Sequence, residues 1–142
     1  MIRYGLFRFG PLRYAIPLLS MRKIVHQSSG YRLPQLPRLV AETLVDDGQL
    51  IPLIKLSGLV ANDEISVRSV DYKVLAESEA GTVAFPAEET CGIVAEQKGD
   101  LLEADDEQGL GVVGLFKYQE TQYKILDIDS LAIAVTSSVQ QE

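Results

Sequence analysis

The stretch that decides the fold is TLVDDGQLIPLIKL, residues 43–56. Asp46-Asp47-Gly48 stands between two apolar runs, and Asp-Gly in that position is typical of the tight turn of a β-hairpin. We therefore predict a strand, a turn and a second strand. Because Pro52 has no N–H to donate to a neighbouring strand, we expect the second strand to lie at a sheet edge or beside a bulge.

Outward from this hairpin, short strand patterns recur at the roughly 8–12-residue spacing that is typical of β-sandwiches and small barrels. Residues 4–17 predict an N-terminal hairpin that turns at Gly10-Pro11, with Phe7 and Phe9 on one face. Further strands are expected at 72–75, 81–85, 91–94, 110–117 and 122–126. The sequence therefore predicts an all-β fold.

Some segments are ambiguous by pattern alone. Residues 20–25 fit either a short helical turn capped by Ser20 or a strand, and residues 130–135 fit either a strand or a helix. Residues 86–90 could open a short helix, and residues 100–107 predict an acidic loop. There is also a loose duplication: the pattern of strand, turn and strand at residues 44–56 returns at residues 115–128.

Composition limits the classes of protein that fit. A chain of 142 residues with 46% apolar and 23% charged residues is expected to fold as a single domain. One cysteine and one histidine exclude a disulfide framework and a zinc site built from several Cys or His ligands. Arginines interrupt the N-terminal apolar runs, and no stretch approaches eighteen apolar residues. We therefore expect neither a signal peptide nor a membrane span, and predict a cytoplasmic protein.

The net charge of −7 conceals an asymmetry. Residues 1–41 contain seven basic residues and no acidic one, whereas residues 42–142 contain all twenty acidic residues and six basic ones. A basic arm for nucleic acid is disfavoured because the basic residues alternate with apolar ones. Our interpretation is that the protein has two lobes of opposite charge, which attract each other.

Gly109, Gly111 and Gly114 match the dinucleotide-binding pattern, and Asp129 follows at about the spacing that this pattern favours. That motif must open a helix, so that the pyrophosphate meets the helix N-terminus. Here acidic residues precede the glycines and the residues after them favour a strand. We therefore interpret the glycines as positions of close strand packing.

Other candidate sites have simple structural interpretations. One cluster of acidic residues lies at Asp100, Glu103, Asp105, Asp106 and Glu107. These residues lack the alternating spacing that is typical of a calcium-binding loop. The carboxylates of Asp127 and Asp129 would share one face of a strand, without a partner for acid–base chemistry. His26 is expected on the surface, and Cys91, with no base nearby in sequence, as a small buried residue. We predict no catalytic residue, no cofactor and no metal.

The chain resembles the CheW-like family, the coupling proteins of bacterial chemosensory arrays. The resemblance is carried by FRFGPLRYAIPLLSMRKIV (7–25), YRLPQLPRLV (31–40), DGQLIPLIKL (47–56), GTVAFPAEETCGIV (81–94) and VVGLFKYQETQYKILDIDSL (112–131). It implies two small five-stranded SH3-like β-barrel lobes that share an apolar core, with few short helices. Residues 1–142 would form one such domain, with a first-lobe segment at about 1–60 and a second-lobe segment plus closing strands at about 61–142.

Two charges depart from the family's pattern. Where the family usually has Asn-Leu-Arg-Gly, this chain has Val45-Asp46-Asp47-Gly48, so that Asp47 replaces an arginine. Lys23 stands where the family usually has an acidic residue. If Lys23 and Asp47 approach each other, they form an ion pair of swapped polarity, which would present a partner with an inverted field.

The resemblance implies a non-enzymatic adaptor that couples the regulatory domain of a CheA-type histidine kinase to the cytoplasmic tip of a chemoreceptor. It also implies that Lys23, Val45, Asp47 and Gly48 contact a partner, because they align with the family's coupling segment. One alternative is a CheW-like module with a different partner or with self-association. Another is a small nucleotide-binding oxidoreductase that uses the glycines at 109–114.

Overall fold

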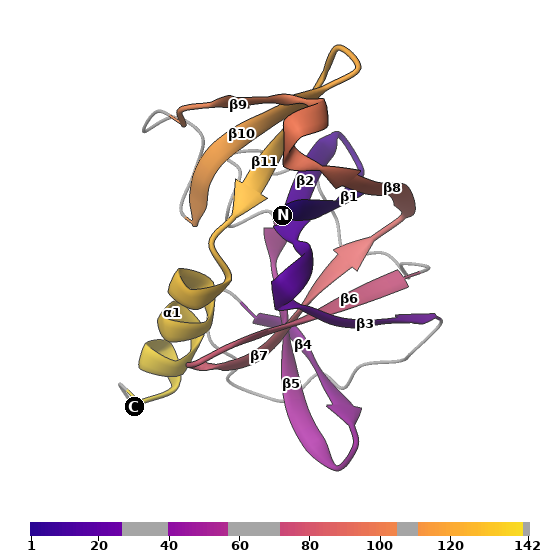
Figure 1. The fold of residues 1–142 in the computed structure, drawn as a ribbon. Helices are drawn as coiled ribbons and strands as arrows, with labels where there is room; N and C mark the ends of the chain where they lie inside the picture. Colours follow the sequence, from indigo (N-terminus) through magenta and orange to yellow (C-terminus); the bar gives the residue numbers. More distant parts are fainter. Residues whose placement is uncertain (27–39, 57–71, 105–110, 141–142) are drawn as a thin grey trace.

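The computed structural model describes residues 1–26, 40–56, 72–104 and 111–140, with side chains up to residue 135. Two mixed β-sheets lie one above the other, and one helix packs beside the lower sheet (Figure 1). The upper sheet has the strand order β8-β1-β2-β11-β10-β9, and the lower sheet has the order β3-β6-β7-β5-β4.

The bounds of the elements are as follows. The six-stranded sheet contains β1 (Arg3–Phe9), β2 (Leu12–Pro17), β8 (Glu89–Ala95), β9 (Asp100–Leu102), β10 (Val112–Tyr118) and β11 (Thr121–Leu126). The five-stranded sheet contains β3 (Met21–His26), β4 (Val40–Asp46), β5 (Gln49–Ile54), β6 (Tyr72–Ser78) and β7 (Gly81–Ala87). The helical elements are the 3-10 turns η1 (Leu18–Ser20) and η3 (Glu96–Lys98) and the helix α1 (Ile128–Gln140).

The predicted hairpins are confirmed. β1 and β2 turn at Gly10-Pro11, and Phe7 and Phe9 both enter the same core. β4 and β5 turn at Asp47 and Gly48, whose φ angles of 49° and 75° are the two positive values of a type I′ turn. The hairpin of β10 and β11 turns in the same way at Gln119 and Glu120, with φ angles of 49° and 66°.

Several local expectations need correction. Residues 86–90 form no helix, because Pro86 and Ala87 pair with β6 at the end of β7, and Glu89 and Thr90 pair with β1 at the start of β8. Arg8 also contacts the carboxylates of Glu88 and Glu89, at 3.3 and 3.1 Å. Asp100–Leu102 is a strand rather than a loop, and pairs with β10. β5 is an interior strand, so Pro52 is not at a sheet edge, but the alternative of a bulge agrees with the register shift of the β4–β5 ladder opposite Leu53 and Ile54. The ladder of β5 with β7 has one register pair, Leu53 with Ala84.

The two ambiguous segments are also resolved. Residues 21–26 form β3, which pairs antiparallel with β6. Residues 130–135 belong to α1, which begins after Asp127. Asp127 caps this helix: its Oδ1 accepts a 3.3 Å hydrogen bond from the Ser130 N–H, and its Oδ2 a 2.6 Å bond from the Ser130 hydroxyl. An apolar stripe at helical spacing faces the core, and consists of Ile128, Leu131, Ala132 and Val135.

The chain uses one arrangement of strands twice. Its first half supplies the β1–β2 hairpin, β3 and the β4–β5 hairpin; its second half supplies the β6–β7 hairpin, β8 and the β10–β11 hairpin. In each sheet, the second strands of two hairpins pair in parallel: β11 with β2, and β5 with β7. The loose duplication in the sequence therefore falls on two hairpins in equivalent positions.

Each half gives its first hairpin to one sheet, and its third strand and second hairpin to the other. The expected boundary near residue 60 lies between β5 and β6 and so separates the two halves of the chain. It does not separate the two sheets, because β3 leaves the first hairpin for the lower sheet and β8 returns to the upper one.

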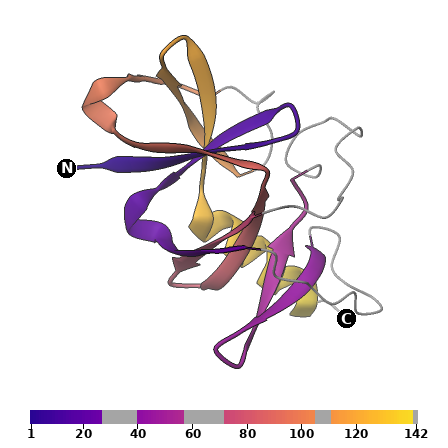
Figure 2. The same cartoon turned by 90° about the vertical axis from the view of Figure 1, so that its right-hand side faces the viewer.

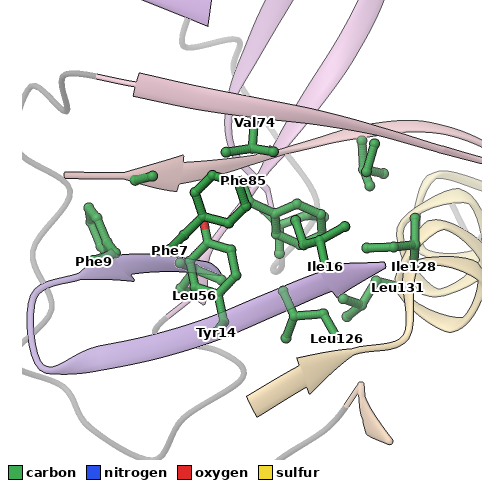
Figure 3. Close-up of a cluster of buried hydrophobic side chains, with 14 of the residues drawn as sticks. Phe7, Phe9, Tyr14, Ile16, Leu56, Val74, Phe85, Leu126, Ile128 and Leu131 are labelled. Atoms are coloured by element: carbon green, nitrogen blue, oxygen red, sulfur yellow. The ribbon is translucent and has the colours of Figure 1, made fainter. Parts of the chain in front are cut away.

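The interior consists of three apolar clusters. A central cluster lies between the sheets and against α1; Phe7, Tyr14, Phe85 and Leu126 belong to it (Figure 3). A second cluster lies on the other face of the six-stranded sheet, and a third, which contains Leu44, Ile51, Leu53, Leu75 and Ala84, on the other face of the five-stranded sheet. The prediction of an all-β fold whose two lobes share a core is confirmed; one sheet has six strands because β9 joins it.

Candidate interaction surface

The predicted contact residues lie around the tip of the β4–β5 hairpin. Val45 is near the end of β4, Asp47 and Gly48 form the turn, and Lys23 is on β3. β3 and β4 are the two opposite edges of the five-stranded sheet, so the sheet must curl to bring them together. The hairpin projects from the body of the protein, away from the six-stranded sheet, in both views (Figures 1 and 2).

Five charged side chains connect β3, β6 and this hairpin, and we call them the tip cluster: Arg22, Lys23, Asp46, Asp47 and Glu77. Lys23 Nζ lies 2.7 Å from Asp46 Oδ1. The Arg22 guanidinium lies 3.2 Å from Asp47, 3.7 Å from Asp46 and 3.6 Å from Glu77. It also donates a 3.5 Å hydrogen bond to Gln49 Oε1.

The ion pairs in the structure differ from the pair suggested by the sequence, which was Lys23 with Asp47. Lys23 contacts Asp46, and it is Arg22 that contacts Asp47. Asp46 lies two residues after Leu44, whose side chain faces the interior of the five-stranded sheet, and Lys23 lies two residues before Val25, which packs on the same cluster. Because side chains alternate along a strand, Lys23 and Asp46 meet over the end of that cluster.

Burial differs among the members of the tip cluster, and the most buried one is the carboxylate of Asp46. The side chains of Arg22 and Lys23 are 24% and 39% exposed, and that of Asp46 is 18% exposed. The side chains of Asp47 and Glu77 are 72% and 58% exposed. The cations therefore lie inside the cluster, and two carboxylates lie on its outer side.

An apolar pair accompanies the charges. Val45 and Leu50 are directly opposite each other on the hairpin, and are 51% and 68% exposed. Ile24, the neighbour of Lys23 on β3, is 42% exposed. The sequence analysis singled out Val45 but missed Leu50 and Ile24. The signal for Leu50 was its place across the turn from Val45, since cross-strand partners share a face.

The charge asymmetry of the sequence produces contacts within each sheet. Arg8 pairs with Glu88 and Glu89 in the six-stranded sheet, and Arg22 and Lys23 pair with acidic residues in the five-stranded sheet. The expectation of two lobes of opposite charge is therefore wrong, because both sheets contain strands from both segments. The opposite charges pair within each sheet.

The other candidate residues do not converge. Gly111 lies just before β10, and Gly114 lies within it. A strand therefore follows where a dinucleotide-binding motif requires a helix. Gly109 lies outside the described residues. Asp127 is a helix cap. His26 is exposed with its ring 4.9 Å from that of Tyr72, and Cys91 is half-buried beside the second cluster.

Carboxylates of the expected acidic loop are described at Asp100 and Glu103 only, and both are exposed. Across the ranges that the structure describes, no three Asp, Glu, His or Cys side chains are grouped so that they could hold a metal ion. In those same ranges, no helix is long and apolar enough to cross a membrane.

A second surface feature is an open recess of about 480 Å³ at the corner between η3 and β9, lined in part by Ile2, Glu96 and Leu101.

The Tyr4 hydroxyl donates a 3.0 Å hydrogen bond to Glu96 Oε2. Burial, together with this bond and the charge of Glu96, raises the pKa of Tyr4 to about 12. Burial also raises the pKa of Tyr14, whose hydroxyl donates to the Pro86 carbonyl oxygen.

Comparison with known proteins gives two findings. The family model described as the CheW-like domain matches residues 3–135. The crystal structure of the scaffolding protein TtCheW from Thermoanaerobacter tengcongensis superposes with a TM-score of 0.73 at 13% sequence identity, and the match covers 88% of each chain. The comparison with curated protein sequences gives no match.

Proposed function

Because the chain belongs to the CheW-like domain family, we propose that it is a non-enzymatic adaptor of chemotaxis-type signalling in the cytoplasm. It couples the regulatory domain of a CheA-type histidine kinase to the cytoplasmic tip of a chemoreceptor. The observation that carries the proposal is the family match over residues 3–135, nearly the whole described fold. The proposed contact positions are Lys23, Val45, Asp47 and Gly48.

The β4–β5 hairpin supports this proposal physically. An exposed apolar pair on a projecting, well-paired hairpin offers a partner buried area, and the charged rim selects among partners. The turn is held in shape by Gly48 and by the contact between Arg22 and Asp47. Besides its proposed contact role, Lys23 holds the hairpin against β3, since its amino group is engaged with Asp46.

The direct test is a calorimetric titration against the regulatory domain of a CheA-type kinase from the same genome, at low and at moderate salt. We expect micromolar binding that weakens as salt increases. The variant Val45→Ser/Leu50→Ser should weaken binding at least tenfold, whereas Val113→Ser, at an exposed position of β10, should not. Absence of binding at both salt concentrations by folded protein would refute the coupling proposal.

A second candidate is a CheW-like module with another partner or with self-association. The observation that favours it is the polarity of the tip, where Asp47 stands in place of the arginine that is usual in the family. Sedimentation equilibrium tests self-association directly. The presence or absence of kinase and receptor genes beside this gene distinguishes an array adaptor from a module with a different partner.

A further inference from the structure

We infer that the partner of the hairpin tip presents a basic surface, in which arginine or lysine side chains surround an apolar recess that receives Val45 and Leu50. The inference rests on the proposed function in one respect, that the tip is an interaction surface. It adds the chemistry of the protein that binds there.

The first argument is the charge balance of the tip cluster. Its two cations, Arg22 and Lys23, face three anions, Asp46, Asp47 and Glu77, which leaves a net charge of −1. The excess charge is on the outside, because Asp47 and Glu77 are the two most exposed members. An approaching protein therefore meets carboxylates before it meets the cations.

The second argument is that the cations are already engaged. Lys23 holds Asp46 at 2.7 Å, and Arg22 is shared among Asp46, Asp47, Glu77 and Gln49. A partner carboxylate would have to displace these contacts. A partner arginine needs no displacement, since each outer carboxylate has oxygen lone pairs left to accept further hydrogen bonds.

The third argument is the position of the apolar pair. Asp46 and Gln49 form the cross-strand pair next to the turn, and Val45 and Leu50 form the pair before it. Because side chains alternate along a strand, Val45 and Leu50 point to the face of the hairpin opposite to that of Asp46, and a partner that covers them meets the tip cluster at the turn, at Asp47. Complementary charge at that rim favours the correct partner and increases the rate of association.

The test uses two short helical peptides that share a central Leu-Leu pair and differ only in flanking residues, arginine in one and glutamate in the other. Methyl-labelled protein is titrated with each peptide, and the methyl resonances of Val45 and Leu50 are followed. Val113, which is 59% exposed on β10 of the other sheet, supplies the control resonances.

We expect the arginine peptide to shift Val45 and Leu50 at concentrations at least tenfold lower than the glutamate peptide does, with Val113 unmoved. The variant Asp47→Asn/Glu77→Gln should reduce this preference to less than threefold. Glu120→Gln removes one charge from the equivalent turn of β10 and β11, and should leave the preference unchanged. Equal response to both peptides, preference for glutamate, or no shift with either would overturn the inference.

The same variants separate this inference from the proposed function. If the kinase domain does not bind but the arginine peptide is preferred, the coupling proposal fails and the polarity of the partner surface stands. If the kinase domain binds and Asp47→Asn/Glu77→Gln leaves its affinity unchanged, the polarity inference fails and the coupling proposal stands.

Discussion

Lys23 and Asp46 join the two edge strands of the five-stranded sheet through a contact of 2.7 Å between Nζ and Oδ1. The ladders of that sheet, as far as the structure describes the chain, do not pair β3 with β4, so this end is closed by side chains. Asp46 Oδ2 is buried and makes no hydrogen bond among the described atoms; the Arg22 guanidinium lies 3.7 Å from it. The carboxylate therefore depends on two cations of the opposite strand.

The first prediction concerns this pair. Lys23→Met should lower the free energy of unfolding by about 1–2 kcal/mol, more than an exposed pair contributes, because it leaves Asp46 half-buried with one distant cation. A double-mutant cycle with Asp46→Asn, measured by urea unfolding, should give a coupling energy of roughly 1 kcal/mol that falls with added salt. Lys98→Met, at an exposed position of η3, is the control. A coupling energy near zero would contradict the prediction.

The second prediction concerns Asp47. We expect Asp47→Arg to weaken partner binding. A direct pair between residues 23 and 47 would let the added change Lys23→Glu partly restore binding, but the new glutamate would lie beside Asp46. We now expect the double variant to be less stable than Asp47→Arg by about 1 kcal/mol, as like charges meet at a partly buried site. Thermal unfolding and calorimetric titration of both variants test this; restored affinity at full stability would contradict it.

The third prediction concerns two of the apolar clusters. Ile51 belongs to the cluster inside the five-stranded sheet, and Leu126 to the central cluster between the sheets. Truncation of either to alanine should cost roughly 2–5 kcal/mol. Because the two side chains belong to different clusters, the double variant should show a sum within about 0.5 kcal/mol. Urea midpoints that do not change would show that these faces are not buried.

The fourth prediction concerns the start of α1. Asp127→Ala removes the hydrogen bonds to the N–H and hydroxyl of Ser130, and should cost about 1 kcal/mol. Hydrogen exchange should accelerate first at the N-terminal turn of α1. Asp127→Asn keeps a side-chain oxygen for the same bond and should retain most of the stability; equal losses in both variants would argue against a capping role.

The fifth prediction concerns pH. Tyr4 has a pKa of about 12 in the folded protein, against about 10 in an unfolded chain. The unfolded state therefore loses its proton first, so the contribution of Tyr4 to stability is full below pH 10 and is lost as the pH rises towards 12. Tyr4→Phe should reduce the decline of unfolding free energy over this interval. Tyr118→Phe, which removes a hydroxyl beside the same cluster, is the control. An unchanged decline in Tyr4→Phe would contradict the assignment.

Turn chemistry and alternation were sufficient to predict most of the hairpins. Gly10-Pro11 and Asp47-Gly48 each mark a reversal between apolar runs, and the structure confirms both turns. Patterns failed where a distant contact decides the local structure. By pattern, residues 86–90 could open a short helix, but Pro86 and Ala87 pair with β6, and Glu89 and Thr90 pair with the distant strand β1.

The sequence placed Val45, Asp47 and Gly48 around one turn, but left the segment of Lys23 open between a helical turn and a strand. It also suggested an ion pair between Lys23 and Asp47, whereas Lys23 contacts Asp46 and Arg22 contacts Asp47. Which base meets which acid depends on the curl of the sheet and on the register shift in β3 between Met21 and Lys23, neither of which is written in local sequence. Exposure of Leu50 likewise follows from the projection of the hairpin tip away from the body of the protein (Figure 1).

The exchange of β3 and β8 between the sheets has a consequence for the origin of the fold. Two copies of one half-chain, each with a hairpin, a crossing strand and a second hairpin, would reproduce the same sheets as a symmetric dimer. Duplication and fusion of such a gene would turn a concentration-dependent association into an intramolecular one. The fused halves would then be free to diverge, so that one turn could become Asp47-Gly48 while its counterpart became Gln119-Glu120.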